Sequence, residues 1–141
     1  MRGIESIPVR VEQSGEALPE CGNALPILHE ILHGLKRLVD DGETTLIDLT
    51  AIPFGPGDEE RLLSLLGRGE VEATLDALGT SYIRETSVPG VWLVDHRNAD
   101  HERIAMHIEI TTVPEILCTQ AQDLQVAVAA LDARIAAGEM S

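Results

Sequence analysis

Apolar residues recur at three- and four-residue intervals in two long segments of the chain, and this spacing predicts two amphipathic helices. We expect the first to run from an Asn23 N-cap to about residue 40 and to end at Gly42. We expect the second over residues 114–137. The predicted buried stripes are Leu25, Leu28, Leu32, Leu35 and Val39 in the first helix, and Leu117, Ala121, Leu124, Val128, Leu131 and Ile135 in the second.

Shorter elements are expected between these helices. Residues 44–50 alternate as a strand, with Leu46, Asp48 and Thr50 on one face and Ile47 and Leu49 on the other. Asp58 is expected to cap a helix that ends at Gly67, because acidic residues follow in its first turn, where the helix dipole favours them. Another short helix is expected over residues 69–79. The predicted packing residues of these two helices are Leu62, Leu63, Leu65 and Leu66, and Val71, Leu75 and Leu78.

Three strands are expected in close succession, near residues 80–88, 90–95 and 103–111, and their short connections predict an antiparallel meander. In the third strand, Ile104, Met106, Ile108 and Ile110 alternate with Ala105, His107, Glu109 and Thr111. We expect the last helix to cover the apolar face of this meander. Because the strands come in a run, the predicted fold class is α+β: a small antiparallel sheet, consisting of a three-strand meander plus an additional strand, covered on one face by helices.

The length of 141 residues suits one domain. We assign it to residues 23–141, and residues 1–22 to an N-terminal arm or linker in which residues 7–11 alternate weakly, as in an edge strand. No apolar run reaches the length of a membrane span, and the N-terminus lacks the pattern of a signal peptide. A cytoplasmic protein is therefore expected.

Acidic residues outnumber basic ones by 24 to 10, which gives a formal net charge of −14. This charge disfavours nucleic acid and anionic membranes and favours basic peptides or proteins as partners. The two cysteines, Cys21 and Cys118, lie too far apart in the chain to form an iron–sulfur or zinc motif by themselves. We expect Cys118 to lie in the core, whereas Cys21 is either an incidental loop cysteine or a redox or metal-relay thiol.

One motif in the first helix suggests an enzyme. His29-Glu30-Ile31-Leu32-His33 has the spacing with which zinc proteases bind zinc through two histidines and activate water with the glutamate. Both histidines, however, fall on the flank of the predicted apolar stripe, and no motif downstream supplies a third ligand. We therefore prefer a plain amphipathic helix and keep a zinc-dependent hydrolase as the alternative function.

A set of short motifs runs through most of the chain. These are Asn23-Ala24-Leu25-Pro26, Leu28-His29-Glu30-Ile31, Ile47-Asp48-Leu49, Leu66-Gly67-Arg68-Gly69-Glu70-Val71, Glu85-Thr86 and Gly90-Val91-Trp92. In this order and spacing they resemble the HupH/HyaF-type family of nickel-iron hydrogenase expression/formation proteins. Members of that family are often longer, so the chain resembles a compact version that keeps the shared C-terminal region.

Four residues within or near these motifs are candidates for partner binding: Glu70, Glu85, Trp92 and Glu109. Glu85 and Glu109 are expected on the outer face of the sheet, where paired carboxylates bind a basic peptide or a metal. The alternative is that all three glutamates are ordinary polar-face or helix-start residues. Trp92 lies either on an open docking face or in the core, and the sequence leaves both positions open.

The resemblance implies a non-enzymatic assembly factor, a chaperone or scaffold for the hydrogenase small-subunit precursor, with other maturation proteins as further partners. It implies no peptidase activity, and the residues themselves indicate no cofactor. The acidic composition is compatible with a basic export peptide as the client segment.

Overall fold

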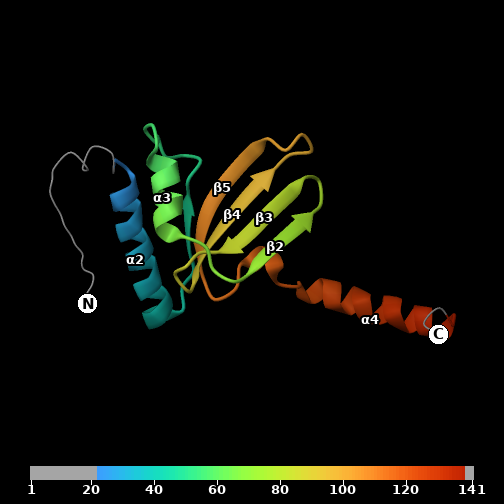
Figure 1. Cartoon of the computed structure of the whole chain (residues 1–141). Coiled ribbons are helices and arrows are strands. Elements are labelled where there is room, and N and C mark those ends of the chain that lie inside the picture. Colours follow the sequence, from blue (N-terminus) through green and yellow to red (C-terminus); the bar gives the residue numbers. More distant parts are fainter. Residues whose placement is uncertain (1–21, 139–141) are drawn as a thin grey trace.

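Five strands form one antiparallel sheet in the order β1-β5-β4-β3-β2 (Figure 1). The computed structural model describes residues 22–138, so the predicted strand at 7–11 and Cys21 lie outside the described residues. The meander is confirmed, and the α+β class with it, but the sheet has five strands rather than four. The elements are α2 (Ala24–Asp41), β1 (Thr45–Asp48), α3 (Asp58–Leu66), β2 (Glu72–Asp76), β3 (Thr80–Glu85), β4 (Val91–Arg97), β5 (Arg103–Ile110), the 3-10 helix η2 (Glu115–Leu117) and α4 (Ala121–Ala136).

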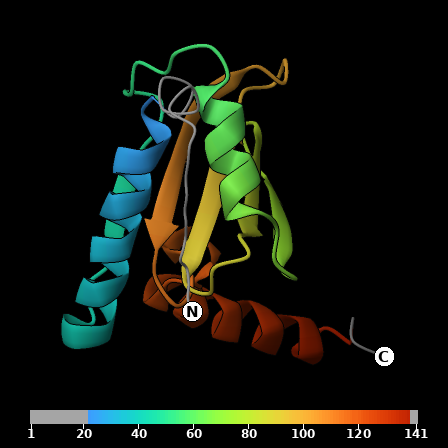
Figure 2. The ribbon, with the colours of Figure 1, turned by 60° about the vertical axis from the view of Figure 1, so that its left-hand side comes forward.

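The main core lies between the sheet and two helices, α2 and α3, which cover the same face (Figure 2). We call this side the helix-covered face and the other side the open face. The alternation predicted for β5 is confirmed here, because Met106, Ile108 and Ile110 are buried against the helices. The buried members of this core are Ala24, Ile27, Ile31, Ile47, Leu49, Leu62, Leu66, Val91, Leu93, Met106, Ile108 and Ile110.

Helix α2 forms where it was predicted, but its buried stripe is rotated. Leu25, Leu32 and Val39 are exposed, whereas Ala24, Ile27, Ile31 and Gly34 are the buried positions. A Cβ on Gly34 would lie 2.5 Å from Cδ1 of Ile110, so the small residues mark the line along which the helix approaches the sheet. The predicted stripe left out Ile27 and Ile31 and therefore misplaced the packing face.

Two capping predictions also change in detail. The side chain of Asn23 makes no capping hydrogen bond, and its Nδ2 donates to the carbonyl oxygen of Pro53 at 2.9 Å. Asp58 is the first residue of α3 rather than its cap, and its carboxylate accepts from the backbone N–H of Gly55 at 2.8 Å. In α3, Leu62 and Leu66 are buried as predicted, but Leu65 is exposed.

The short helix predicted over residues 69–79 is wrong, because this segment is the edge strand β2. The apolar residues of this segment fit the repeat of a helix and also that of a strand. Val71, Leu75 and Leu78 are spaced as in a helix, whereas Val71, Ala73 and Leu75 alternate as in a strand. Pairing with β3 selects the strand, since it gives each backbone group on that side a partner.

The last helix is also shorter and lies elsewhere than expected. Residues 115–117 form η2, and α4 then extends away from the sheet instead of covering it (Figure 1). Every residue of α4 is exposed. Cys118, predicted in the core, is an exposed free thiol between the two helices. None of the described helices combines the length and apolarity that a membrane span requires.

Candidate functional site

Trp92 lies on the open face of β4 but is buried there. Val91 and Leu93 point to the helices, and Trp92 joins Ile83 and Val94 in a second, smaller core. Leu117 of η2 packs against this cluster, which leaves the indole 7% exposed. The Nε1–H of Trp92 also donates to the carbonyl oxygen of Thr111 at 3.2 Å. The sequence left two positions open for Trp92, an open docking face or the core. In the structure Trp92 lies on the open face and is part of a small core there.

Glu109 lies beside Trp92 on β5, and its side chain is buried as well. Its Oε2 accepts the backbone N–H of Glu115 at 3.1 Å, and its Oε1 lies 3.6 Å from Nε2 of His107. Trp92 and Glu109 therefore attach the same segment, residues 111–117, to the open face. The buried carboxylate of Glu109 thus lies at the base of the surface above it.

Glu85 and Glu109 share the open face, as predicted, but Trp92 stands between them. The strand register pairs Trp92 with Glu85 of β3 on one side and with Glu109 of β5 on the other. The two carboxylates therefore do not form a pair. They flank the indole at opposite sides of one cross-strand row.

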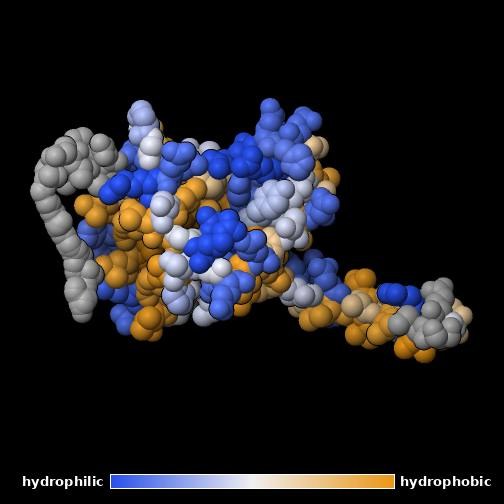
Figure 3. Space-filling model, viewed as in Figure 1, coloured by the Kyte–Doolittle hydropathy of each residue, from blue (hydrophilic) through white to orange (hydrophobic). Residues whose placement is uncertain are grey.

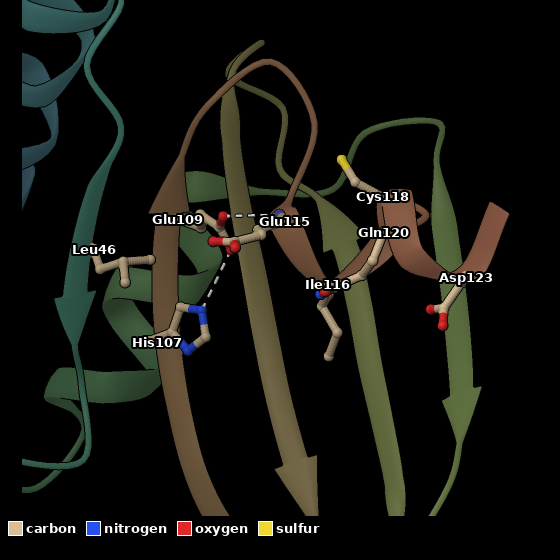
Figure 4. A pocket seen from close by; sticks show the side chains of 8 residues that line it. All are labelled: Leu46, His107, Glu109, Glu115, Ile116, Cys118, Gln120 and Asp123. Atoms are coloured by element: carbon tan, nitrogen blue, oxygen red, sulfur yellow. Dashed lines mark hydrogen bonds and ion pairs between the residues drawn. The ribbon is translucent and has the colours of Figure 1, made fainter. Parts of the chain in front are cut away.

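A groove of about 550 Å³ opens above Glu109 (Figure 4). We call it the Glu109 groove. The side chains of His107 and Glu109 come from β5, and those of Glu115 and Ile116 come from η2 on the facing side. Its lining consists of Leu46, His107, Glu109, Glu115, Ile116, Cys118, Gln120 and Asp123. Three of these residues carry carboxylates, so the groove suits a cationic or hydrogen-bond-donating group.

The sequence Leu66-Gly67-Arg68-Gly69-Glu70-Val71 forms a loop that is fixed to the end of β3. Gly69 donates its N–H to the carbonyl oxygen of Glu85 at 2.8 Å, and Glu70 donates its N–H to Oε1 of Glu85 at 3.4 Å. A Cβ on Gly69 would lie 2.6 Å from the carbonyl oxygen of Thr86, so this approach requires glycine. Glu85 thus positions the loop, while the side chain of Glu70 is exposed.

Arg84 holds the same loop from the helix-covered face. Its Nη1 donates to the carbonyl oxygen of Gly67 at 2.9 Å. Burial lowers the pKa of Arg84, the charge of Arg68 lowers it further, and the charge of Glu72 acts in the opposite direction. Gly67 has φ 68° and ψ −158°, a combination that is almost restricted to glycine. The motif therefore has a clear structural role in joining α3 to the sheet.

The two histidines of the protease-like motif lie on the exposed side of α2. His33 borders a shallow hollow with Arg37, whose guanidinium donates to Oγ1 of Thr45 at 2.9 Å. A cation at this place disfavours a divalent metal ion. Within residues 22–138, no three His, Cys, Asp or Glu side chains are grouped so that they could hold a metal.

Further polar residues of the open face were not proposed from the sequence. Oγ of Ser81 lies 2.7 Å from Nδ1 of His96, and the ring of His96 lies 5.7 Å from that of His107, measured between centroids. The alternation of β5 predicts that His107 and Glu109 lie on one face, so this part of the groove could be predicted from the sequence. Glu115 and Asp123 could not, because their position depends on the turn after β5.

Comparisons with known proteins agree on one family. Residues 21–137 match the family described as "HupH hydrogenase expression protein, C-terminal conserved region". The hydrogenase expression/formation protein HoxQ of Azotobacter vinelandii is 32% identical over 117 residues, which are 82% of this chain and 41% of HoxQ. The hydrogenase-1 operon protein HyaF of Escherichia coli is 28% identical over 102 residues, which are 72% of this chain and 35% of HyaF. The chain thus spans less than half the length of these curated relatives.

A solved structure supports the same relationship. The hydrogenase expression protein HupH from Thiobacillus denitrificans superposes with a TM-score of 0.78 and 47% sequence identity, and the match covers 82% of this chain and 96% of that chain. Residues 21–137, which match the family, contain β1–β5, η2 and every residue that lines the Glu109 groove. The chain therefore belongs to the HupH family of hydrogenase expression proteins and contains its C-terminal conserved region.

Proposed function

We propose that this protein is a non-enzymatic assembly factor, a chaperone or scaffold, in the maturation of a nickel-iron hydrogenase. The observation that carries the proposal is an acidic groove inside the region that matches the hydrogenase expression family. Related proteins are named as hydrogenase expression/formation proteins. The proposed client is the small-subunit precursor, bound in the cytoplasm before export together with other maturation proteins.

The chemistry of the Glu109 groove supports a basic, extended client segment. Glu115 and Asp123 are exposed at its rim, and Glu109 adds a buried negative charge beneath them. Leu46 and Ile116 are exposed apolar side chains in the same lining. Lysine or arginine side chains would form charge-assisted hydrogen bonds at the rim while their aliphatic parts pack on the apolar residues.

The proposed binding residues have different roles in this arrangement. Glu70 is exposed and Glu85 is half-buried, so both are available at the β3 side of the open face. Glu109 acts at the β5 side. Trp92 lies between them and is buried, so its proposed contribution is to hold the platform rather than to contact the client. Binding of this kind requires no cofactor and no reactive group.

Capture of an unexported small-subunit precursor by the purified full chain tests the proposal. Affinity should fall as salt rises, because exposed carboxylates are screened over about 8 Å at physiological ionic strength. Glu115→Lys combined with Asp123→Lys should weaken capture by more than about tenfold. These rim residues are preferable to Glu109, since a lysine at that buried position would disturb the fold.

Asp100→Lys combined with Glu102→Lys is the matched control, because both are exposed acids in the turn between β4 and β5, at the other end of the sheet, and the change in net charge is the same. It should leave capture nearly unchanged. Equal losses in both variants would indicate a diffuse electrostatic field and contradict a defined groove. No capture at any salt concentration would exclude the small subunit as the direct client.

A further inference from the structure

Helix α4 exposes an apolar surface that a monomer leaves in water. All its residues are exposed, and its polar residues are confined to Gln122, Asp123, Gln125, Asp132 and Arg134. Figure 3 shows apolar colouring along much of this helix, away from the sheet. An isolated 16-residue helix is marginal in water, and a helix that is mostly apolar is normally covered. The exposed apolar surface of α4 is therefore typical of a surface that binds a partner.

The spacing of the large side chains identifies the kind of partner. Leu124, Val128, Leu131 and Ile135 follow each other at intervals of four, three and four residues, which is the repeat of a coiled-coil seam. Leucine alternates with a β-branched residue along this seam, a combination that favours two strands in parallel dimers and leaves the orientation to be decided by other features. All four side chains are exposed, Val128 to 71%. The seam is thus complementary to a second α4.

Charge determines how two such helices are oriented. Each chain carries a net charge of −14, so two copies repel each other wherever their sheets come close. Helix α4 is about 24 Å long at 1.5 Å per residue, which is roughly three Debye lengths at physiological ionic strength. An antiparallel pair places the two sheet domains at opposite ends of the seam. A parallel pair places them side by side.

We propose that α4 pairs with α4 of a second copy of this chain as an antiparallel two-helix seam. In this register Leu124 lies opposite Ile135 of the other copy, and Val128 lies opposite Leu131. Each of the four layers then combines one leucine with one β-branched residue. The seam contains no charged side chain, because Asp132 and Arg134 lie on its flanks.

The small size of this contact predicts a reversible dimer. Four layers between two short helices bury on the order of 1,000 Å² in total, the lower limit for a specific interface. We therefore expect a monomer–dimer equilibrium in the micromolar range rather than a permanent assembly. It does not depend on the proposed client, and it responds to salt in the opposite direction. Screening should strengthen the dimer, because the sheet domains repel each other.

Sedimentation of the full chain without any client tests the dimer. The average mass should rise with protein concentration, and the dissociation constant should be lower at about 500 mM than at about 50 mM NaCl. Val128→Asp places a charge in the seam and should raise the dissociation constant by more than about tenfold. Val126→Asp is the matched control, because Val126 is 66% exposed on the same helix but lies outside the seam.

Three results would overturn the proposal. The first is a monomer at every concentration, and the second is an equal effect of both valine variants. The third is ready disulfide formation between the two Cys118 residues of a Cys21→Ser dimer under mild oxidation. Cys118 lies at the N-terminal side of α4, so only a parallel pair brings the two thiols together. Urea unfolding of both valine variants should show that the sheet domain stays folded as in the wild type.

Discussion

Replacement of Trp92 tests the inference that the open face contains a second core. Trp92→Ala removes a side chain that is 7% exposed and packs on Ile83, Val94 and Leu117. Truncation of a buried aromatic residue of this size costs about 3–5 kcal/mol of unfolding free energy. Because small domains have only about 5–15 kcal/mol in total, the variant should be strongly destabilised or unfolded.

A second variant separates packing from hydrogen bonding at the same position. Trp92→Phe keeps most of the apolar surface but removes the N–H that donates to the carbonyl oxygen of Thr111. An unsatisfied buried acceptor costs about 1–3 kcal/mol, so this variant should lie between the alanine variant and the wild type. Tyr82→Ala is the control, since Tyr82 on the neighbouring strand is 41% exposed and should cost about 1 kcal/mol or less.

Urea unfolding followed by far-ultraviolet circular dichroism is the suitable assay, because the alanine and phenylalanine variants lack the chain's single tryptophan. In the wild type, a buried indole predicts blue-shifted fluorescence that acrylamide, a neutral quencher, quenches poorly. The reasoning would be refuted by red-shifted, readily quenched fluorescence. It would also be refuted if Trp92→Ala were no more destabilising than Tyr82→Ala.

Two further predictions concern α2 and the loop after α3. Replacing both His29 and His33 with Gln should change the unfolding free energy by less than about 0.5 kcal/mol, because both side chains are exposed; a large loss of stability, together with loss of bound zinc in elemental analysis, would contradict this. Gly69→Ala should destabilise the domain by about 1–3 kcal/mol in urea unfolding, since its Cβ would lie 2.6 Å from the carbonyl oxygen of Thr86 and 2.9 Å from Oε1 of Glu85. Wild-type stability in this variant would show that the loop is not held as described.

Sequence patterns correctly predicted those elements whose structure depends mainly on residues that are close together in the chain. The alternation in β5 identified its buried face, because side chains of a strand alternate whatever covers them. The buried stripe predicted for the last helix was wrong, because its members in α4 are exposed and periodicity does not tell which surface, if any, covers a helix face. The buried line of α2 was missed for a related reason. The leucines of this helix suggested one stripe, whereas the structure buries Ile27, Ile31 and the small residues Ala24 and Gly34.

The candidate site shows the same limit. His107 and Glu109 were placed on one face from the strand pattern alone, and the structure brings them together at the groove. Glu115 and Asp123 reach the same groove only because residues 111–117 turn back over the open face. That turn is fixed by Glu109, which holds the N–H of Glu115 across the turn, and by Trp92, which comes from another strand. No local pattern contains this information.

The position of β1 at the far side of β5 has a consequence for how the domain forms during synthesis. The strands β2 to β5 are neighbours both in sequence and in the sheet, so they can pair as soon as each hairpin is complete. Ile47 of β1, in contrast, pairs with Ile108 of β5, 61 positions later (108 − 47 = 61). Among residues 22–138, the first strand to be synthesised must therefore remain unpaired until the last one follows. Until then α2 and β1 hold their apolar residues without a sheet to cover them, so the chain is exposed to aggregation during this interval.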